Sequence, residues 1–248
     1  MLLDIAGKPL IAHTLGQALK VRGVSRVIVA TDDERIYRAV EQNGGEAMMT
    51  SEEHLSGTDR VAEVAGKLPE GSIIVNVQGD EPTISPKTIE TAIEALLNDD
   101  AADMSTTCER IATRWELLDG NNVKVVTGDD GYAVYFSRSP VPFPRDAAQR
   151  YHGDPGLAIE EEPELLVHFR KHTGLYVYRR EYLLKFAKMA PTTLERFESL
   201  EQLRALENGA RIRVVEVSET SIGVDASADL ERVRAIIEGD AERAEPPA

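Results

Sequence analysis

The chain has 248 residues, of which 28 are Lys or Arg and 43 are Asp or Glu, so its formal charge at pH 7 is −15. This acidity excludes nonspecific binding to nucleic acid or anionic membranes, because such binding needs basic side chains that neutralise phosphates. With 42% hydrophobic and 29% charged residues, the composition is that of a globular protein with one sizeable core. We expect one domain over residues 1–238 and a flexible tail over 239–248, which is charged and rich in Pro.

The single cysteine, Cys108, excludes an intrachain disulfide and a thiolate zinc cluster, which indicates a reducing, cytoplasmic location. We interpret Cys108 as a small buried residue rather than a nucleophile, since the sequence beside it offers no evident base. No apolar segment approaches the roughly 20 residues of a membrane span, so we expect no membrane insertion.

The first half of the chain alternates short apolar runs with helical patterns. Residues 26–32 predict a strand, and residues 33–42 predict a helix that Asn43 and the two following glycines end. Residues 72–77 predict a second buried strand, followed by a helix over 86–97. Continuous apolar strands that alternate with helices indicate a parallel sheet covered on both faces.

The second half has a different pattern, because residues 123–126 and 132–136 flank a turn-rich segment that is typical of an antiparallel hairpin. Beyond it we expect a strand over 173–178, a long helix over 193–208, a strand over 212–217 and a helix over 227–237. The acidic, Pro-containing stretch 151–166 predicts an exposed, mobile loop with a solvated surface.

Polar residues follow the predicted strands of the first half. No G-x-G-x-x-G or G-x-x-x-x-G-K-[ST] motif is present, so the common dinucleotide and Walker loops are excluded. Ligands of open α/β sheets bind at the carboxyl ends of strands, where the sequence places Thr31, Asp32 and the segment 78–81. Taken alone, Asp80 could be a Mg²⁺ ligand or a turn residue, and Asp225 is more typical of an ordinary helix cap.

Ordered sequence blocks then point to a family. They are Asp4–Ile11 (DIAGKPLI), 29–32 (VATD), 56–60 (SGTDR), 75–82 (VNVQGDEP), 135–138 (YFSR), 172–176 (HTGLY), 200–204 (LEQLR) and 223–225 (GVD). In these blocks the chain resembles the 3-deoxy-manno-octulosonate cytidylyltransferases, the CMP-Kdo synthetases, from residue 1 to about residue 237.

The resemblance implies a Rossmann-like nucleotidyltransferase fold, with a mixed, mostly parallel central sheet and a smaller antiparallel subdomain on the sugar side. It implies transfer of a cytidylyl group from CTP to 3-deoxy-D-manno-octulosonate (Kdo), giving CMP-Kdo and diphosphate for lipopolysaccharide biosynthesis. It also implies Mg²⁺ as the cofactor and a homodimer. In such a transfer, catalysis comes largely from positioning and electrostatic stabilisation.

The resemblance also assigns residues. It implies that Asp80 and Asp225 are the catalytic, metal-binding pair. The nucleotide-binding residues that it implies are Thr31, Asp32, Ser56, Gly57, Thr58, Arg60 and Gln78. The residues that it implies for the sugar acid are Ser137, Arg138, Arg145, His172, Tyr176, Glu201 and Gln202. Their chemistry suits Kdo, because Arg can bind a carboxylate through two hydrogen bonds and the others can bond to hydroxyls.

Several of these residues also have ordinary structural interpretations. Without the resemblance, the Ser56–Thr58 segment would be a turn in which Thr58 caps the next helix. Glu198, which shares a face of the predicted long helix with Glu201 and Gln202, would be a solvated side chain, and His172 a packed histidine. The remaining histidines lack metal-ligand spacing, so we interpret them as structural or surface residues; they are His13, His54, His152 and His168.

The chain departs from the family pattern in two places. The family's first strand and Arg-Leu-Pro-Gly-Lys loop, which serve the triphosphate, precede the matched region and are not in this sequence. We expect Met1 to be an internal methionine of a longer natural protein, with a genuinely truncated homologue as the alternative. After Asp225, residues 226–229 replace the family's Thr-Pro-Glu-Asp, so we expect Ser227 or Asp225 to cap the following helix.

Two other functions stay open. One is a sister cytidylyltransferase that uses another acidic sugar, such as 8-amino-Kdo or an acylneuraminate. The other is a noncatalytic nucleotide-binding remnant, which predicts CTP binding without release of pyrophosphate.

Overall fold

The computed structural model describes residues 1–219, 221–224 and 226–239, and the chain divides into two compact units. Unit 1 comprises Met1–Thr91 with the described residues of Glu219–Ala248, and unit 2 comprises Ala92–Ser218. The single domain expected over 1–238 stays a prediction. Of the predicted tail, all but Gly239 falls outside the described residues.

Unit 1 consists of short strands and amphipathic helices. Its elements are β1 (Asp4–Ile5), β2 (Lys8–Pro9), α1 (Leu10–Ala18), β3 (Ile28–Thr31), α2 (Glu34–Gln42), β4 (Glu46–Met49), α3 (Gly57–Gly66), β5 (Ile73–Asn76), the first part of α4 (Pro86–Leu97) and α11 (Ser227–Glu238). β3 and β4 pair in parallel, with Thr31 opposite Met49. α2 begins after Asp33, whose carboxylate accepts a hydrogen bond of 2.8 Å from the Arg35 N–H.

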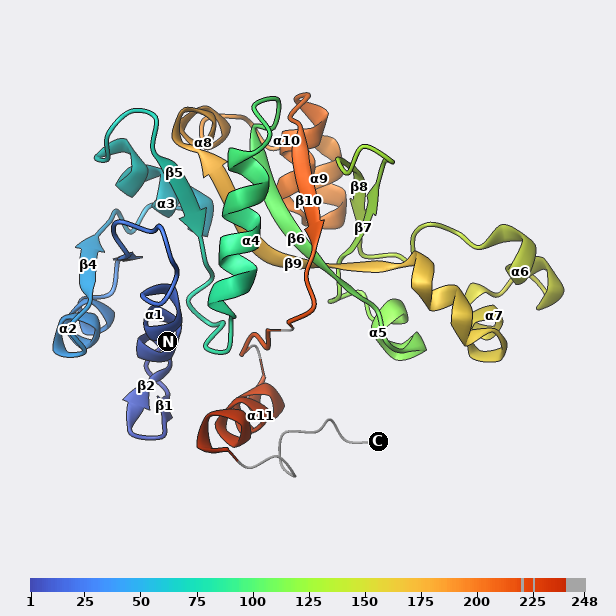
Figure 1. Ribbon diagram of the computed structural model, residues 1–248, viewed down its shortest axis with the longest axis horizontal. Helices are drawn as coiled ribbons and strands as arrows, with labels where there is room; N and C mark the ends of the chain where they lie inside the picture. The colour runs from blue at the N-terminus through green and yellow to red at the C-terminus, as the bar shows by residue number, and fades with distance from the viewer. Residues whose placement is uncertain (220, 225, 240–248) are drawn as a thin grey trace. The chain divides into compact units, whose positions relative to one another are not determined.

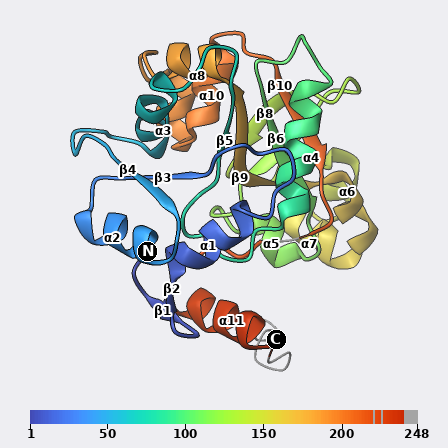
Figure 2. The same cartoon turned by 60° about the vertical axis from the view of Figure 1, so that its left-hand side comes forward.

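The core of unit 1 forms where helices cover these strands. Ile11 and Leu15 of α1 pack with Val40 of α2, and Val29 of β3 lies against them. A second cluster joins the start of the chain to its last described helix. Figure 2 shows α11 beside β1 and β2, where Val233 packs with Ile5 and Leu10.

Unit 2 holds a sheet whose strands run in the order β10-β6-β9-β7-β8. The strands are β6 (Met104–Arg110), β7 (Lys124–Thr127), β8 (Ala133–Ser137), β9 (Arg170–Arg179) and β10 (Ile212–Glu216). β10 pairs with β6 in parallel, whereas β6 pairs with β9, and β7 with both β9 and β8, in antiparallel. The predicted mixed α/β fold and the antiparallel hairpin are therefore confirmed.

The helices of unit 2 lie in two groups. They are α5 (Arg114–Leu118), α6 (Arg145–Arg150), α7 (Pro155–Glu161), the 3₁₀ helix η1 (Pro163–His168), α8 (Arg180–Phe186), α9 (Thr193–Glu198) and α10 (Glu201–Glu207). Figure 1 shows α6 and α7 at one end of this unit, well apart from α8, α9 and α10. Cys108 lies in β6 and is buried, as predicted.

The predicted helix over 193–208 is wrong, because α9 ends at Glu198 and α10 begins at Glu201. Ser199 between them has a φ of +54°, in the left-handed region that an α-helix cannot include. Glu198 therefore does not share a helix face with Glu201 and Gln202.

The stretch 151–166 is not a loop, since it contains α7 and most of η1. Asp154 accepts hydrogen bonds from the N–H groups of Gly156 and Leu157 and starts α7, whose first residue is Pro155. Ile159 of α7 is buried in a cluster of apolar residues of unit 2. The acidic residues that follow lie at the end of an ordered helix.

The start of α11 is also capped differently from the prediction. Its cap position is Ala226, whose N–H donates to the Asp229 carboxylate at 3.0 Å, and Ser227 is the first helical residue. Asp225 lies outside the described residues. Within the part of the chain that the structure describes, no helix is both long and apolar enough to cross a membrane.

Candidate active site

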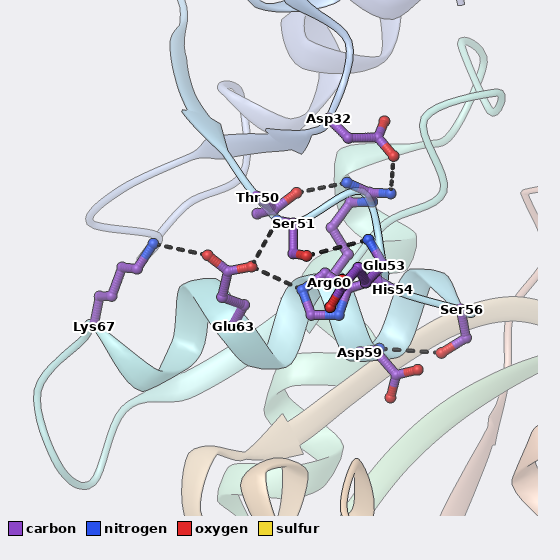
Figure 3. Close-up of polar contacts among 10 residues, drawn as sticks. All are labelled: Asp32, Thr50, Ser51, Glu53, His54, Ser56, Asp59, Arg60, Glu63 and Lys67. Atoms are coloured by element: carbon purple, nitrogen blue, oxygen red, sulfur yellow. Dashed lines mark hydrogen bonds and ion pairs between the residues drawn. The ribbon is translucent and has the colours of Figure 1, made fainter.

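The ends of β3 and β4 are joined by the guanidinium group of Arg60. Its Nη2 donates to Oδ2 of Asp32 and its Nη1 donates to Oγ1 of Thr50, both at 2.5 Å (Figure 3). The Thr50 N–H in turn donates to the carbonyl oxygen of Thr31 at 2.9 Å. Arg60 thus binds one other predicted nucleotide-binding residue, Asp32, and both of these guanidinium nitrogens donate to protein oxygens.

The predicted nucleotide-binding turn, residues 56–58, forms the start of α3. Ser56 caps this helix, since its Oγ accepts a hydrogen bond of 3.1 Å from the Asp59 N–H. The cap is therefore not Thr58, which is one residue inside the helix and buried. Gly57 between them is exposed, and a Cβ there would meet no atom within 4 Å. The backbone at Gly57 can therefore be approached closely by a ligand.

The segment Gln78-Gly79-Asp80 follows β5 and is held against two other parts of unit 1. Oγ1 of Thr14 in α1 donates to the Gly79 carbonyl at 2.8 Å. A Cβ at Gly79 would lie only 2.9 Å from the Met1 sulfur, so the end of that flexible side chain would have to shift to make room for it. The Val224 N–H donates to the Asp80 carbonyl at 2.9 Å. The chain immediately before Asp225 therefore lies beside Asp80.

The predicted Mg²⁺ ligands are represented in the structure by Asp80 alone. Within residues 1–219, 221–224 and 226–239, no group of three or more His, Cys, Asp or Glu side chains could hold a metal. Mg²⁺ is commonly bound by one or two protein carboxylates together with substrate phosphates and water. Asp80 fits that kind of donor set as one of the carboxylates. The second would come from Asp225, which follows Val224 in the sequence, and the Val224 N–H is bonded to the Asp80 carbonyl.

In unit 2, Ser137 and Arg138 are organised by Glu198. One carboxylate oxygen accepts from the Ser137 hydroxyl at 2.7 Å, and the other accepts from the Arg138 N–H at 2.9 Å. The guanidinium of Arg138 donates to the carbonyl oxygens of Glu198, Gly120 and Ser199. These contacts tie the end of β8 to the break between α9 and α10.

His172 and Tyr176 lie together on β9, with ring centroids 5.3 Å apart. Thr106 has one hydroxyl proton, which it donates to the Leu175 carbonyl at 2.6 Å. The hydroxyl must therefore accept from Nε2 of His172 at 2.8 Å, which places the proton of the neutral ring on Nε2. Burial lowers the pKa of His172 to about 3 and raises the pKa of the Tyr176 phenol, so both side chains are uncharged at neutral pH.

Glu201, at the start of α10, is held by Arg204. Nη2 of Arg204 lies 2.5 Å from Oε1 of Glu201 and 3.0 Å from Oε1 of Glu195 in α9. Arg204 is itself buried, and its guanidinium lies over the Phe186 ring, 4.8 Å from the centroid. Gln202, the other predicted sugar-binding residue of α10, is buried as well.

Arg145 is the first residue of α6, a helix that Figure 1 shows well apart from α9 and α10. Its side chain is exposed and lines a pocket of about 370 Å³, together with Arg150, His168 and the apolar residues Leu165 and Phe169. Of the sugar-side residues, the structure therefore brings six into the region of β8, β9 and α10, and places Arg145 elsewhere in unit 2.

Residues 1–212 match the model of a protein family described as cytidylyltransferase. The chain belongs to the cytidylyltransferase family. It is 54% identical to the 3-deoxy-manno-octulosonate cytidylyltransferase of Geobacter sulfurreducens over 232 residues, which cover 94% of this chain and 90% of that protein. It is likewise 54% identical to the protein of the same name from Geotalea uraniireducens, with the same coverage.

Comparison with solved structures agrees. The structure of CMP:2-keto-3-deoxy-manno-octonic acid synthetase complexed with CTP superposes with a TM-score of 0.84 at 41% identity, covering 96% of this chain and 91% of that one. The 4-diphosphocytidyl-2C-methyl-D-erythritol synthase of Anaerococcus prevotii has a TM-score of 0.60 at 13% identity, so it shows the fold alone. The family resemblance and the fold predicted from the sequence are confirmed.

Sequence reasoning missed the side chains that hold the predicted site residues in place. Glu63 and His54 bind each other at 2.7 Å beside the nucleotide-side turn; His54 was predicted to be a structural or surface residue, but Glu63 was given no role. Glu198 was considered only as part of a long helix, and Arg204 was given no role. A usable signal existed for Glu63, which lies three residues after Arg60 and so on the same face of α3.

Proposed function

We propose that this chain transfers the cytidylyl group of CTP to Kdo, giving CMP-Kdo and diphosphate. The observation that carries the proposal is the 54% identity, over 94% of the chain, to proteins named 3-deoxy-manno-octulosonate cytidylyltransferase. The same chemistry is in keeping with a solved relative at 41% identity that was complexed with CTP.

In the proposed reaction, the anomeric hydroxyl oxygen of Kdo attacks the α-phosphorus of CTP. The new bond joins that oxygen to phosphorus, the bond from the α-phosphorus to the oxygen bridging to the β-phosphorus breaks, and diphosphate leaves. The hydroxyl proton passes to solvent. Because no covalent intermediate with the protein is needed, the protein's part is to position both substrates and stabilise charge.

The nucleotide would be bound in unit 1. Thr31, Asp32 and Gln78 offer hydroxyl, carboxylate and amide groups, and the open backbone at Gly57 lets a base or ribose approach the start of α3. Asp80 and Asp225 would hold Mg²⁺, which screens the phosphate charges when it is bound. The formal charge of −15 gives the chain a further need for such screening.

The sugar acid would be bound in unit 2. The neutral His172 and Tyr176 rings and the Glu201 carboxylate offer several hydrogen-bonding groups for hydroxyls. Arg138 lies with these groups at the end of β8 and is the better-placed arginine for the Kdo carboxylate, whereas Arg145 lies elsewhere in unit 2. We further propose a homodimer, a cytoplasmic location and a role in lipopolysaccharide biosynthesis.

The test is release of pyrophosphate from CTP, Mg²⁺ and Kdo by the purified chain. Kdo should support turnover better than 8-amino-Kdo or an acylneuraminate, with CTP binding measured separately by calorimetry. Faster turnover with one of the other sugars would replace Kdo as the substrate. Binding of CTP with no turnover on any sugar would favour a noncatalytic nucleotide-binding protein.

A further inference from the structure

Glu63, in the middle of α3, binds the loop 51–56 that leads into the nucleotide-side turn 56–58. Its Oε2 accepts two hydrogen bonds, from the Ser51 N–H at 2.9 Å and from Nε2 of His54 at 2.7 Å. Figure 3 shows both groups converging on this one carboxylate from the loop. A single side chain of the helix thus holds two positions of the loop.

The pair formed by Glu63 and His54 is charge-assisted. Hydrogen bonds from the Ser51 N–H, from His54 and from Lys67 lower the pKa of Glu63 to about 2, so the carboxylate is ionised at neutral pH. An ionised carboxylate can only accept hydrogen bonds, so Nε2 of His54 must carry a proton. The two side chains are 28% and 22% exposed, so the contact is partly shielded from water.

The other end of the loop is fixed to the same helix. Ser56 caps α3 through the Asp59 N–H, while within the loop the Ser51 hydroxyl accepts from the Glu53 N–H at 3.1 Å. Leu55, between the two anchored ends, is 98% exposed. The loop is therefore a short bridge whose two ends are set by α3 and whose tip lies in solvent.

We propose that Glu63 is a positioning residue for nucleotide binding, which sets the turn 56–58 by anchoring Ser51 and His54 and does not touch CTP itself. This inference rests on the proposed function. The reason is preorganisation. A turn that must place its groups within hydrogen-bond distance of a base or ribose binds CTP more weakly when its own conformation is not fixed before the ligand arrives.

The decisive variant is E63Q, which keeps the size of the side chain but removes its charge. We expect the Kd for CTP, measured by calorimetry, and the KM for CTP to rise about tenfold, as expected for loss of charge-assisted hydrogen bonds. The KM for Kdo should stay within about twofold, because the sugar-side residues are in unit 2. A general loss of stability would not separate the two substrates in this way.

Two further variants make the test specific. K67M removes the third partner of Glu63, a Lys that donates to Oε1 at 3.0 Å from the end of α3 without contacting the loop, and should leave CTP affinity unchanged. H54A removes the anchor from the loop side, and H54Q restores an N–H donor. We expect H54A to weaken CTP binding and H54Q to recover most of it.

The outcomes separate this inference from the proposed function. If the parent chain neither binds CTP nor releases pyrophosphate, the proposed function fails and this inference fails with it. If the parent is active but E63Q and H54A bind CTP as tightly as the parent, only the inference is overturned. It is equally overturned if K67M weakens CTP binding as much as E63Q does, or if E63Q raises both KM values equally.

Discussion

Replacing Arg204 by Met should destabilise the chain, because it removes a buried cation that pairs with two acidic side chains. Arg204 is 7% exposed, and its Nη2 lies 3.0 Å from a Glu195 oxygen and 2.5 Å from a Glu201 oxygen. Its Nη1 also donates to the Met189 carbonyl at 3.0 Å. Removing one partner of a buried charge pair costs about 3–5 kcal/mol. The Glu195 and Glu201 side chains left behind are 13% and 29% exposed, so water screens them in part and we expect the lower end of this range, about 3 kcal/mol.

The free energy of unfolding of R204M, obtained from urea denaturation, should therefore fall by about that amount. R204K should lose less, because it keeps the charge but not the planar, two-sided contact. R38M is the matched control, since Arg38 forms an exposed pair with Glu34 one helical turn away and should change stability by no more than about 0.5 kcal/mol. If the free energy of unfolding falls no more in R204M than in R38M, the ion pairs of Arg204 with Glu195 and Glu201 do not stabilise the fold as inferred.

Three further predictions concern the sheet of unit 2. E198A should lose about 1–3 kcal/mol of unfolding free energy and raise the KM for Kdo, because Ser137 loses its acceptor; unchanged values for both would contradict the role given to Glu198. His172 has a native pKa of about 3 against 6.5 when exposed, so only the unfolded chain binds this proton between those values, and the free energy of unfolding falls as pH drops through that range, by about 1.4 kcal/mol per pH unit. In urea titrations at several pH values, H172Q, whose amide can still donate to Thr106, should show a shallower fall, and an identical slope would show that another group is responsible. Burial raises the pKa of Cys108 to about 12, so a thiol reagent at pH 8 should label the native chain negligibly and one thiol per chain in urea; rapid native labelling would contradict the burial.

The sequence predicted elements whose formation depends on local pattern. The helix after Asp33 and the antiparallel hairpin of β7 and β8 are confirmed, because the cap residue and the turn-rich segment are local signals. The helix start at Ser56 was assigned to Thr58 instead, since Ser and Thr are both good cap residues and stand two positions apart. Local chemistry alone does not choose between such neighbours.

The errors arose where tertiary contacts override local pattern. Residues 193–208 contain no Gly or Pro that would mark a break, and the break at Ser199 accompanies the hydrogen bonds of Glu198 to the end of β8. The stretch 151–166 did contain a helix signal, Asp154 followed by Pro155, which its acidic composition outweighed in the prediction. The roles of the predicted site residues stay predictions, and Asp225 lies outside the described residues.

The exposed tip of the loop 51–56 offers a way to observe ligand binding directly. The chain has one native cysteine, which is buried, so L55C would supply the only thiol open to a reagent in the folded protein. Leu55 is 98% exposed and takes no part in the contacts of Glu63 or Ser56 described above. A fluorophore attached there would sit next to the turn 56–58 without replacing any of its anchors, and its emission could be followed during a CTP titration.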